Sequence, residues 1–273
     1  MLVRFCHFRY SGPHVLVEPK ENDAIDISIV VAAYNEQALL PRCLESIAVA
    51  REATDARVEV IVVDNGSTDD TATIAHASGA RVVTEPRLGA VHAKCAGVRS
   101  ARGAIIAVLD ADSVCPADWL TRIAHSFSSQ SDLVGVTGPA RYTGGRFWAP
   151  AFIWFWYAWW RVVACLAGRA VYAVGTNVAF RREAYLRSDG FDLGVLVGGD
   201  EISLFSSLAK VGRTSFDVSL VVETDARRVN IGLLRFLWEV FFLHYVVNYT
   251  YYRITGRSLM KHYRPGSTLS RSS

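Results

Sequence analysis

The stretch DISIVVAAYNE, residues 26–36, decides the fold, because a β-branched apolar run that stops at a polar loop is typical of a buried strand. Two more stretches repeat the pattern, VEVIVVDNGSTDD at 58–70 and AIIAVLDADS at 104–113. Segments with the apolar spacing of helices separate them. Strands alternating with helices predict right-handed βαβ crossovers, and therefore an α/β, Rossmann-like fold with a mostly parallel sheet and helices on both faces.

The connecting segments can be assigned in the same way. The predicted helices cover Ala38–Ala53, Asp69–Ala77, Gly89–Ala101 and Asp118–Phe127, and a short strand covers Arg81–Thr84. Ser67 or Thr68 could cap the second helix, because hydroxyl groups bind the free N–H groups of a first helical turn.

A polar cluster ends each of the three core strands: Asn35-Glu36, Asp64-Asn65 and Asp110-Ala111-Asp112. Asp and Asn are common in turns, so one such cluster would say little. Three clusters after successive strands predict a site, because ligands of open α/β sheets bind outside the carboxyl ends of the strands. Asp110 and Asp112 could share a hard divalent cation and leave coordination positions for phosphate oxygens.

Two residues have both a functional and an ordinary interpretation. Asp64 could accept a hydrogen bond from a nucleobase N–H, or it could cap the helix that follows. Lys94 could complement a base carbonyl or a phosphate, or it could be a solvated lysine. The pattern by itself leaves both open.

Composition places the chain among globular proteins, since 51% of its 273 residues are hydrophobic and 20% are charged. The net charge of +3 is too small to make nucleic acid an expected partner. Five scattered cysteines without a CxxC pair argue against a disulfide framework and a structural zinc site. The first residues lack the pattern of a signal peptide, so we expect a reduced, cytoplasmic setting.

Two hydrophobic stretches point to a membrane surface. Phe147–Trp160 holds five of the seven tryptophans, and Ile231–Tyr252 is long but interrupted by charged residues. From Ala226 to Ser273, eight Arg and Lys residues accompany one acid, a net charge of +7 that leaves −4 for the rest. Trp prefers the headgroup region and basic residues attract anionic lipid, so we expect interfacial helices, peripheral on the inner face of the cell membrane. Buried helices or an oligomer contact are the alternatives.

Six segments follow one another along the chain: VVAAYNE, VVDNGSTDDT, GAVHAKCAGVRSARG, AVLDADS, GTNVAFRREAYLRSDGFD and GGDEISLFSSLAKVG. In this order they resemble the motifs of family 2 glycosyltransferases of the bacterial type with hydrophobic C-terminal helices, over about Ile27–Gly212. The resemblance implies a GT-A fold, a nucleotide-sugar donor, a divalent metal (Mn²⁺ or Mg²⁺) and usually inversion at the anomeric carbon. The expected organisation is a lead-in at 1–24, a GT-A glycosyltransferase domain at 25–228 and a hydrophobic, basic helical region at 229–273.

The resemblance also implies roles for individual residues. Asp112 would ligate the metal, and Asp110 would contact the ribose or the metal. Asp64 would bind the base with Lys94 close to it, and Gly175–Asn177 would form the donor-sugar side. The full set of implied substrate-binding residues is Ala33, Tyr34, Glu36, Asp64, Lys94, Asp110, Asn177, Arg227 and Arg228. The last two would bind a phosphate or an acceptor headgroup, unless they form a solvated basic turn.

Three features depart from the family pattern. Asn65 stands where a second Asp is frequent, Cys95 stands where an Asn is frequent, and the usual Glu-Asp pair is reversed as Asp200-Glu201. The spacing to Gly212 puts Glu201 at the position of the general base, with Asp200 supporting it or capping the helix. The sequence has no QxxRW motif of processive synthases, which favours transfer of a single sugar.

The expected function is inverting, metal-dependent transfer of one sugar to a hydroxyl or lipid-phosphate acceptor at the membrane surface. A UDP-sugar is the favoured donor and a GDP-sugar the second choice, and the acceptor is expected to be a membrane lipid or a lipid-linked molecule. A sugar nucleotidyltransferase is one alternative, although the first strand ends without the Gly-rich phosphate loop that it would need. A degenerate scaffold that keeps the fold without turnover is the other.

Overall fold

A computed structural model describes residues 25–144, 149–167, 170, 173–193 and 200–228, together with the single residues 238, 247 and 251. The predicted lead-in at 1–24 and almost all of the predicted helical region at 229–273 lie outside the described residues. Those two boundaries therefore stay predictions.

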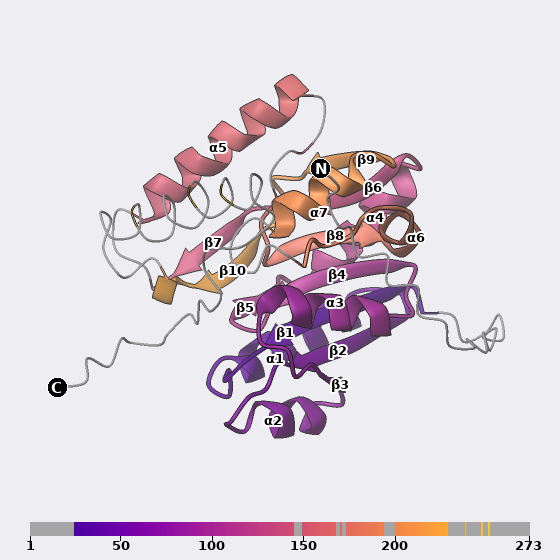
Figure 1. Ribbon diagram of the computed structural model, residues 1–273. Coiled ribbons are helices and arrows are strands. Elements are labelled where there is room, and N and C mark those ends of the chain that lie inside the picture. Colours follow the sequence, from indigo (N-terminus) through magenta and orange to yellow (C-terminus); the bar gives the residue numbers. More distant parts are fainter. Residues whose placement is uncertain are drawn as a thin grey trace.

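A seven-stranded sheet in the order β3-β2-β1-β4-β8-β6-β9 forms the centre of the molecule (Figure 1). The strands β1, β2, β3 and β4 are parallel to one another, as are β6 and β9, and β8 runs antiparallel to both β4 and β6 beside it. The bounds are Ile27–Ala33 for β1, Val58–Asp64 for β2, Arg81–Thr84 for β3, Ile105–Asp110 for β4, Leu133–Thr137 for β6, Asn177–Arg181 for β8 and Arg213–Phe216 for β9. The mixed α/β class with a mostly parallel sheet is confirmed.

Helices cover both faces of this sheet because its strands are apolar on both sides. In β1, Ile29 and Val31 pack on one face with α1, α2 and α4, whereas Val30 packs on the other face with α3, α6 and α7. Alternate strand residues point to opposite faces, so a continuous apolar run requires a layer on each. The helices are α1 at Leu40–Glu52, α2 at Thr71–Ala77, α3 at Ala90–Ser100, α4 at Trp119–Ser129, α6 at Arg182–Arg187 and α7 at Asp200–Leu208.

The helix α3 lies unusually close to the sheet. A Cβ atom added at Gly97 would lie 2.2 Å from Cγ1 of Val30, so only glycine permits this approach. Lys94 is one turn earlier on the same helix and is buried as a result.

A second, three-stranded sheet brings the last described strand, β10, next to the segment that follows β4. Its strands are β5 at Ser113–Val114, β10 at Val222–Asp225 and β7 at Ala140–Thr143, with β10 in the middle. The N–H group of Asp225 donates to the carbonyl of Asp112 over 3.2 Å. The short 3-10 turn η2 at Ala226–Arg228 is thereby placed beside the end of β4.

The predicted capping of the second helix by Ser67 or Thr68 is wrong. The helix α2 begins at Thr71, after an N-cap residue, Asp70, that makes no side-chain cap bond. The hydroxyl of Ser67 instead accepts the N–H of Asn35, and the N–H of Thr68 donates to Oδ1 of Asn35. These residues join the loops after β1 and β2 rather than starting a helix.

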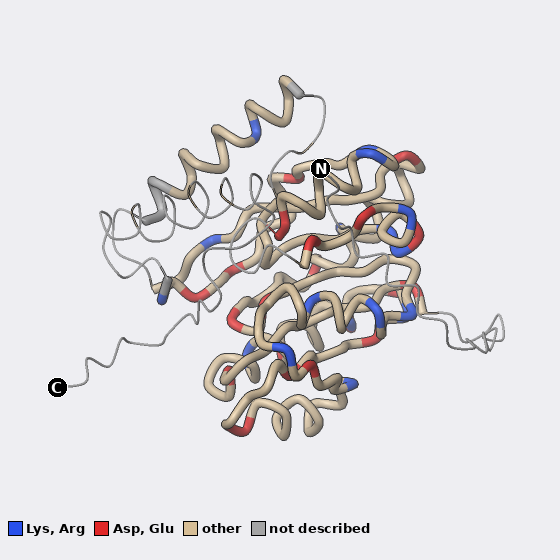
Figure 2. Tube along the Cα trace, in the orientation of Figure 1, with Lys and Arg blue, Asp and Glu red and all other residues tan. Residues whose placement is uncertain are grey.

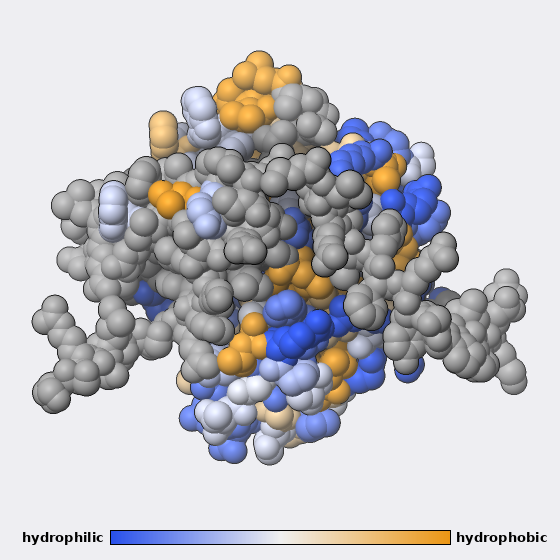
Figure 3. Space-filling view, viewed as in Figure 1, coloured by the Kyte–Doolittle hydropathy of each residue, from blue (hydrophilic) through white to orange (hydrophobic). Residues whose placement is uncertain are grey.

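The tryptophan-rich stretch forms α5, at Ala149–Ala167, which lies apart from the helices that cover the large sheet (Figure 1). On its inner side Tyr157 stands 6.1 Å from Phe216, ring centre to ring centre. Its outer side exposes Trp154 (73%), Trp159 (56%) and Leu166 (85%). Arg161 is its one charged residue, the rest of the helix that is coloured in Figure 2 is tan, and Figure 3 shows apolar surface on it. Within the described residues, no helix combines the length and hydropathy needed to cross a bilayer.

Asn65 holds the loop between β3 and α3. Its side-chain amide donates to the carbonyls of Glu85 and Arg87, each over 2.8 Å, and its Oδ1 accepts the N–H of Gly89 over 2.8 Å. The side chain is buried, so these three bonds have no water to replace them. A carboxylate could make only the last of them, which explains why this chain has Asn here.

We expect Asn65→Asp to lower the free energy of unfolding by about 1–3 kcal/mol, because two buried carbonyls would lose their donors and face a carboxylate. Urea denaturation at neutral pH measures the change. Asn35→Asp is the matched control, since Asn35 uses its side chain as an acceptor for Thr68 and a carboxylate can do the same. Equal stability of the two variants would contradict this account of Asn65.

Candidate active site

The acidic clusters predicted from the sequence meet at one edge of the sheet. In the strand register Ala33 lies opposite Asp64, and Ala32 lies opposite Asp110. The carboxyl ends of β1, β2 and β4 are therefore neighbours, and the loops that follow them form a common rim. We call this edge the acidic rim; it comprises Glu36, Asp64, Asp110 and Asp112.

An arginine in the turn η2, which follows the second sheet, pairs with two carboxylates of the acidic rim. The Nη2 atom of Arg227 lies 2.5 Å from Oε1 of Glu36 and 2.9 Å from Oδ2 of Asp112. Its Nε lies 4.0 Å from Asp225. Burial would lower the pKa of Arg227, but the carboxylates of Glu36 and Asp112 outweigh it and raise the pKa above the usual value. The guanidinium is a permanent positive charge at the position where the sequence predicts a metal.

The side chain of Asp112 is fixed by hydrogen bonds and could serve as one carboxylate ligand of a metal. Its side chain is 8% exposed, and its Oδ1 accepts the hydroxyls of Thr224 at 3.3 Å and Ser113 at 3.4 Å. Among the residues described, no three His, Cys, Asp or Glu side chains are grouped as a metal cage would require. The donor set still fits Mg²⁺ or Mn²⁺ bound together with a diphosphate, because such ions take one or two carboxylates and fill their coordination with phosphate oxygens and water.

A second polar cluster lies behind the rim and contains Lys94, Asp200 and Glu201. The Nζ atom of Lys94 is 3.4 Å from Oδ2 of Asp200, 3.3 Å from Oε1 of Glu201 and 3.4 Å from the carbonyl of Gly175. The side chain of Lys94 is 4% exposed. Burial alone would lower its pKa, but the charges of Asp200, Glu201 and Asp110 raise it instead, so Lys94 remains an ammonium ion. Lys94 therefore pairs with Asp200 and Glu201, and not with Asp64 or with bulk water.

The environment of Glu201 favours a proton acceptor. Burial and the adjacent charge of Asp200 raise the pKa of Glu201 to about 7, against the lowering effect of Lys94. Gly175 makes room for it, since a Cβ atom there would lie 1.7 Å from Oε1 of Glu201. A carboxylate with a pKa near neutrality can take a proton at physiological pH and release it again.

The other predicted residues fall into three groups. Asp64 stays on the rim, where its Oδ1 accepts the N–H of Ser67 over 3.0 Å, and Ala33 and Tyr34 adjoin it at the end of β1. Asn177 does not reach the rim: it is fully buried, accepts from Trp119 and donates to the carbonyl of Leu220. Arg228 belongs to η2, and its side chain lies outside the described part.

Thr176 belongs to the segment Gly175–Asn177, which the resemblance assigns to the donor-sugar side, and it contacts the end of β4. Its hydroxyl lies 2.5 Å from that of Ser113 and accepts the N–H of Asp110 over 3.3 Å. It ties the end of β4 to the loop before β8. The sequence feature that points to Thr176 is its position between Gly175 and Asn177 in the GTN segment.

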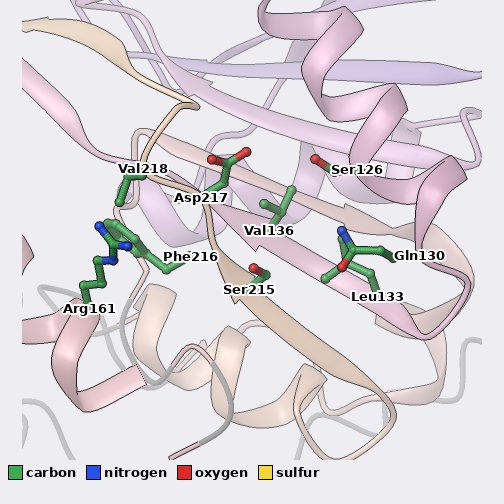
Figure 4. A pocket seen from close by; sticks show the side chains of 9 residues that line it. All are labelled: Ser126, Gln130, Leu133, Val136, Arg161, Ser215, Phe216, Asp217 and Val218. Atoms are coloured by element: carbon green, nitrogen blue, oxygen red, sulfur yellow. The ribbon is translucent and has the colours of Figure 1, made fainter. Parts of the chain in front are cut away.

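A pocket of the described residues lies away from these residues. It has a volume of about 220 Å³ and is bounded by α4, β6, β9 and α5, with Arg161 beside Phe216 and Val218 (Figure 4). None of the predicted site residues lines it. A much smaller hollow borders Asp112, Thr224 and Asp225 on the rim itself.

The chain is similar in sequence and in fold to known glycosyltransferases. Residues 28–187 match the model of the family described as Glycosyl transferase family 2. A glycosyltransferase of Mycobacterium tuberculosis is 40% identical over 122 residues, which are 45% of this chain and 52% of that protein. An undecaprenyl-phosphate 4-deoxy-4-formamido-L-arabinose transferase of Sodalis glossinidius is 34% identical over 117 residues, 40% of this chain and 36% of that protein.

Solved structures agree in fold. A mannosyltransferase of Pyrobaculum calidifontis, in complex with GDP-Man and Mn²⁺, superposes with a TM-score of 0.61 at 25% identity over 73% of this chain and 56% of that one. The chain thus matches between 36% and 56% of the length of these proteins. The GT-A fold is nevertheless shared. Since the family model spans more than half of its residues, the chain belongs to glycosyl transferase family 2.

Proposed function

We propose that the protein is an inverting, metal-dependent glycosyltransferase that moves one sugar from a nucleotide-sugar donor to a hydroxyl or lipid-phosphate acceptor at a membrane surface. The observation that carries the proposal is that two clusters of polar side chains lie at the same end of the sheet. Asp112 stands on the rim where a diphosphate can bind, and the Lys94–Asp200–Glu201 cluster stands behind it as a site for proton transfer.

The donor half follows from the rim. Asp64, with Ala33, Tyr34 and Glu36, is proposed to hold the nucleoside, and Asp110 to bind the ribose or the metal. Asp112 would hold a divalent metal, which lowers the negative charge of the leaving diphosphate. The Pyrobaculum mannosyltransferase was solved with GDP-Man and Mn²⁺, so GDP-sugars are tested beside the UDP-sugars that we favour.

The acceptor half follows from the cluster behind the rim. For a hydroxyl acceptor, Glu201 takes the proton as the oxygen forms its bond to the anomeric carbon and the bond to the diphosphate breaks on the opposite side. Asp200 keeps the pKa of Glu201 high, and Lys94 fixes both side chains in position. A lipid phosphate is already ionised, so it would need no base.

The membrane part of the proposal rests on two features. The outer face of α5 exposes Trp154, Phe155 and Trp159, and the residues from Ala226 onwards carry a net charge of +7. Trp suits the headgroup layer and basic residues suit anionic lipid. The Sodalis relative acts on undecaprenyl phosphate by its name, which makes a lipid-linked acceptor the first to test. A protein of this kind would work on the inner face of the cell membrane.

Glu201→Gln should lower turnover on a hydroxyl acceptor by about 10²–10⁴-fold, because the variant keeps the size but loses the basic oxygen. In the unchanged protein, kcat/KM should fall as the pH drops through about 7, since protonated Glu201 cannot act as a base. Glu201→Gln should not show this fall of kcat/KM at low pH. Asp200→Asn should cost less. A larger loss of turnover in Asp200→Asn than in Glu201→Gln would assign the general base to Asp200. Unchanged turnover in both variants would favour an acceptor that is already ionised, such as a lipid phosphate.

Asp112→Asn should abolish sugar transfer while the protein stays folded, because one oxygen ligand and one charge are lost at the diphosphate. Excess EDTA should also abolish transfer by the unchanged protein. Added Mn²⁺ or Mg²⁺ should restore the activity of the unchanged protein but not that of Asp112→Asn. Circular dichroism checks the fold of the variant. Full turnover in EDTA would contradict the metal requirement, and no turnover with any donor would favour a degenerate scaffold.

Replacing Trp154 and Trp159 together by Ser should weaken co-sedimentation with anionic liposomes, because both side chains lie on the exposed face of α5. Higher salt should weaken binding further by screening the basic residues. Leu186→Ser is the control, since Leu186 is also an exposed apolar residue (65%) but belongs to α6. Equal loss in both proteins, or binding that ignores lipid charge and salt, would count against the proposal.

A further inference from the structure

We propose that Arg227 is the resident cation of the donor site: it neutralises Glu36 and Asp112 when the site is empty and leaves Asp112 when a metal-bound diphosphate arrives. The inference deepens the proposed function and rests on it. It assigns to Arg227 a gating role in metal binding, in addition to the phosphate contact expected from the sequence.

The contacts of Arg227 show that it competes for the metal ligand itself. Its Nη2 atom bridges Glu36 and Asp112, at 2.5 and 2.9 Å. The bond to Asp112 uses Oδ2, while Oδ1 of Asp112 is already shared by the hydroxyls of Thr224 and Ser113. Oδ1 therefore already accepts two hydrogen bonds, and Oδ2, the oxygen with acceptor capacity left for a metal, is the one that Arg227 contacts.

Charge decides which partner leaves. Divalent ions of this kind bind carboxylate oxygens at about 2.0–2.1 Å. A metal at Oδ2 would then lie within a few ångströms of the guanidinium, and two cations at that separation repel strongly in a partly buried site. The hydroxyls of Thr224 and Ser113 carry no charge and can remain. Arg227 is therefore the group that a metal must displace.

Arg227 is also placed to move. Its side chain is 34% exposed, compared with 15% for Glu36 and 8% for Asp112. It sits in the short turn η2 rather than in a long helix. Its Nε is buried without a hydrogen-bond partner in the described structure, so the guanidinium keeps a donor for a ligand oxygen. A diphosphate offers such oxygens, and thus compensates Arg227 for the carboxylate it loses.

The consequence is that metal and nucleotide bind together. A metal alone would have to displace Arg227 without supplying it a new anion, whereas a metal with a nucleoside diphosphate supplies one. Metal affinity without nucleotide should therefore be low, and removal of the arginine charge should raise it.

The test is a titration of Mn²⁺ followed by the electron paramagnetic resonance signal of the free ion, with and without UDP or GDP. We expect Arg227→Gln to bind Mn²⁺ without nucleotide about ten- to a hundredfold more tightly than the unchanged protein, the usual size of coupling between two ligands of one site. Arg227→Lys keeps the charge and should stay near the unchanged protein. Arg141→Gln is the matched control, because Arg141 pairs with Glu223 on the neighbouring strands of the same small sheet. It should leave Mn²⁺ affinity within about twofold.

Other results would overturn the inference in distinguishable ways. Equal Mn²⁺ affinity in Arg227→Gln and the unchanged protein, with melting curves that show both folded, would refute the gate but leave the proposed function standing. The same gain in Arg141→Gln or Arg227→Lys would mean that general charge or side-chain shape, and not displacement of this cation, controls the metal. Sugar transfer in EDTA with no Mn²⁺ binding at all would defeat both the gate and the metal part of the proposed function.

Discussion

The concentration of carboxylates at one end of the sheet is the constraint on which this structure depends. The parallel strands β1, β2 and β4 deliver their acidic ends to one place, and α7 adds Asp200 and Glu201 behind them. Like charges this close and this poorly solvated repel one another. Two cations offset the repulsion: Lys94 holds the pair on α7, and Arg227 holds Glu36 and Asp112.

The architecture around the rim can be understood as the means of placing those cations. Glycine at position 97 lets α3 approach β1, and the buried helix then carries Lys94 towards α7. The strand β10 pairs with β5 directly after Asp112, and this pairing brings Arg227 to a carboxylate 115 positions earlier in the chain. The difference in exposure between the two cations matches their proposed roles, because Lys94 is enclosed as a permanent support whereas Arg227 keeps access to solvent.

Surface and site are separate on this molecule. The exposed aromatic face of α5 and the pocket beside Arg161 lie away from Asp112, and none of the rim residues belongs to either. The proposed function would use such a division, with one surface facing the membrane and another binding a soluble, charged donor.

The sequence alone determined the alternation of strands and helices, the acidic strand ends and the family, because apolar periodicity and ordered motifs are local properties of the chain. It also predicted that Glu36, Asp64, Asp110 and Asp112 would meet, since parallel crossovers bring successive strand ends to one edge. Only the tertiary structure decided that β8 runs antiparallel, that Asn177 is a buried brace and that Ser67 and Thr68 join loops. The partners of Lys94 and Arg227 were likewise hidden, because contacts between residues more than a hundred positions apart depend on helix packing and strand pairing that no local pattern records.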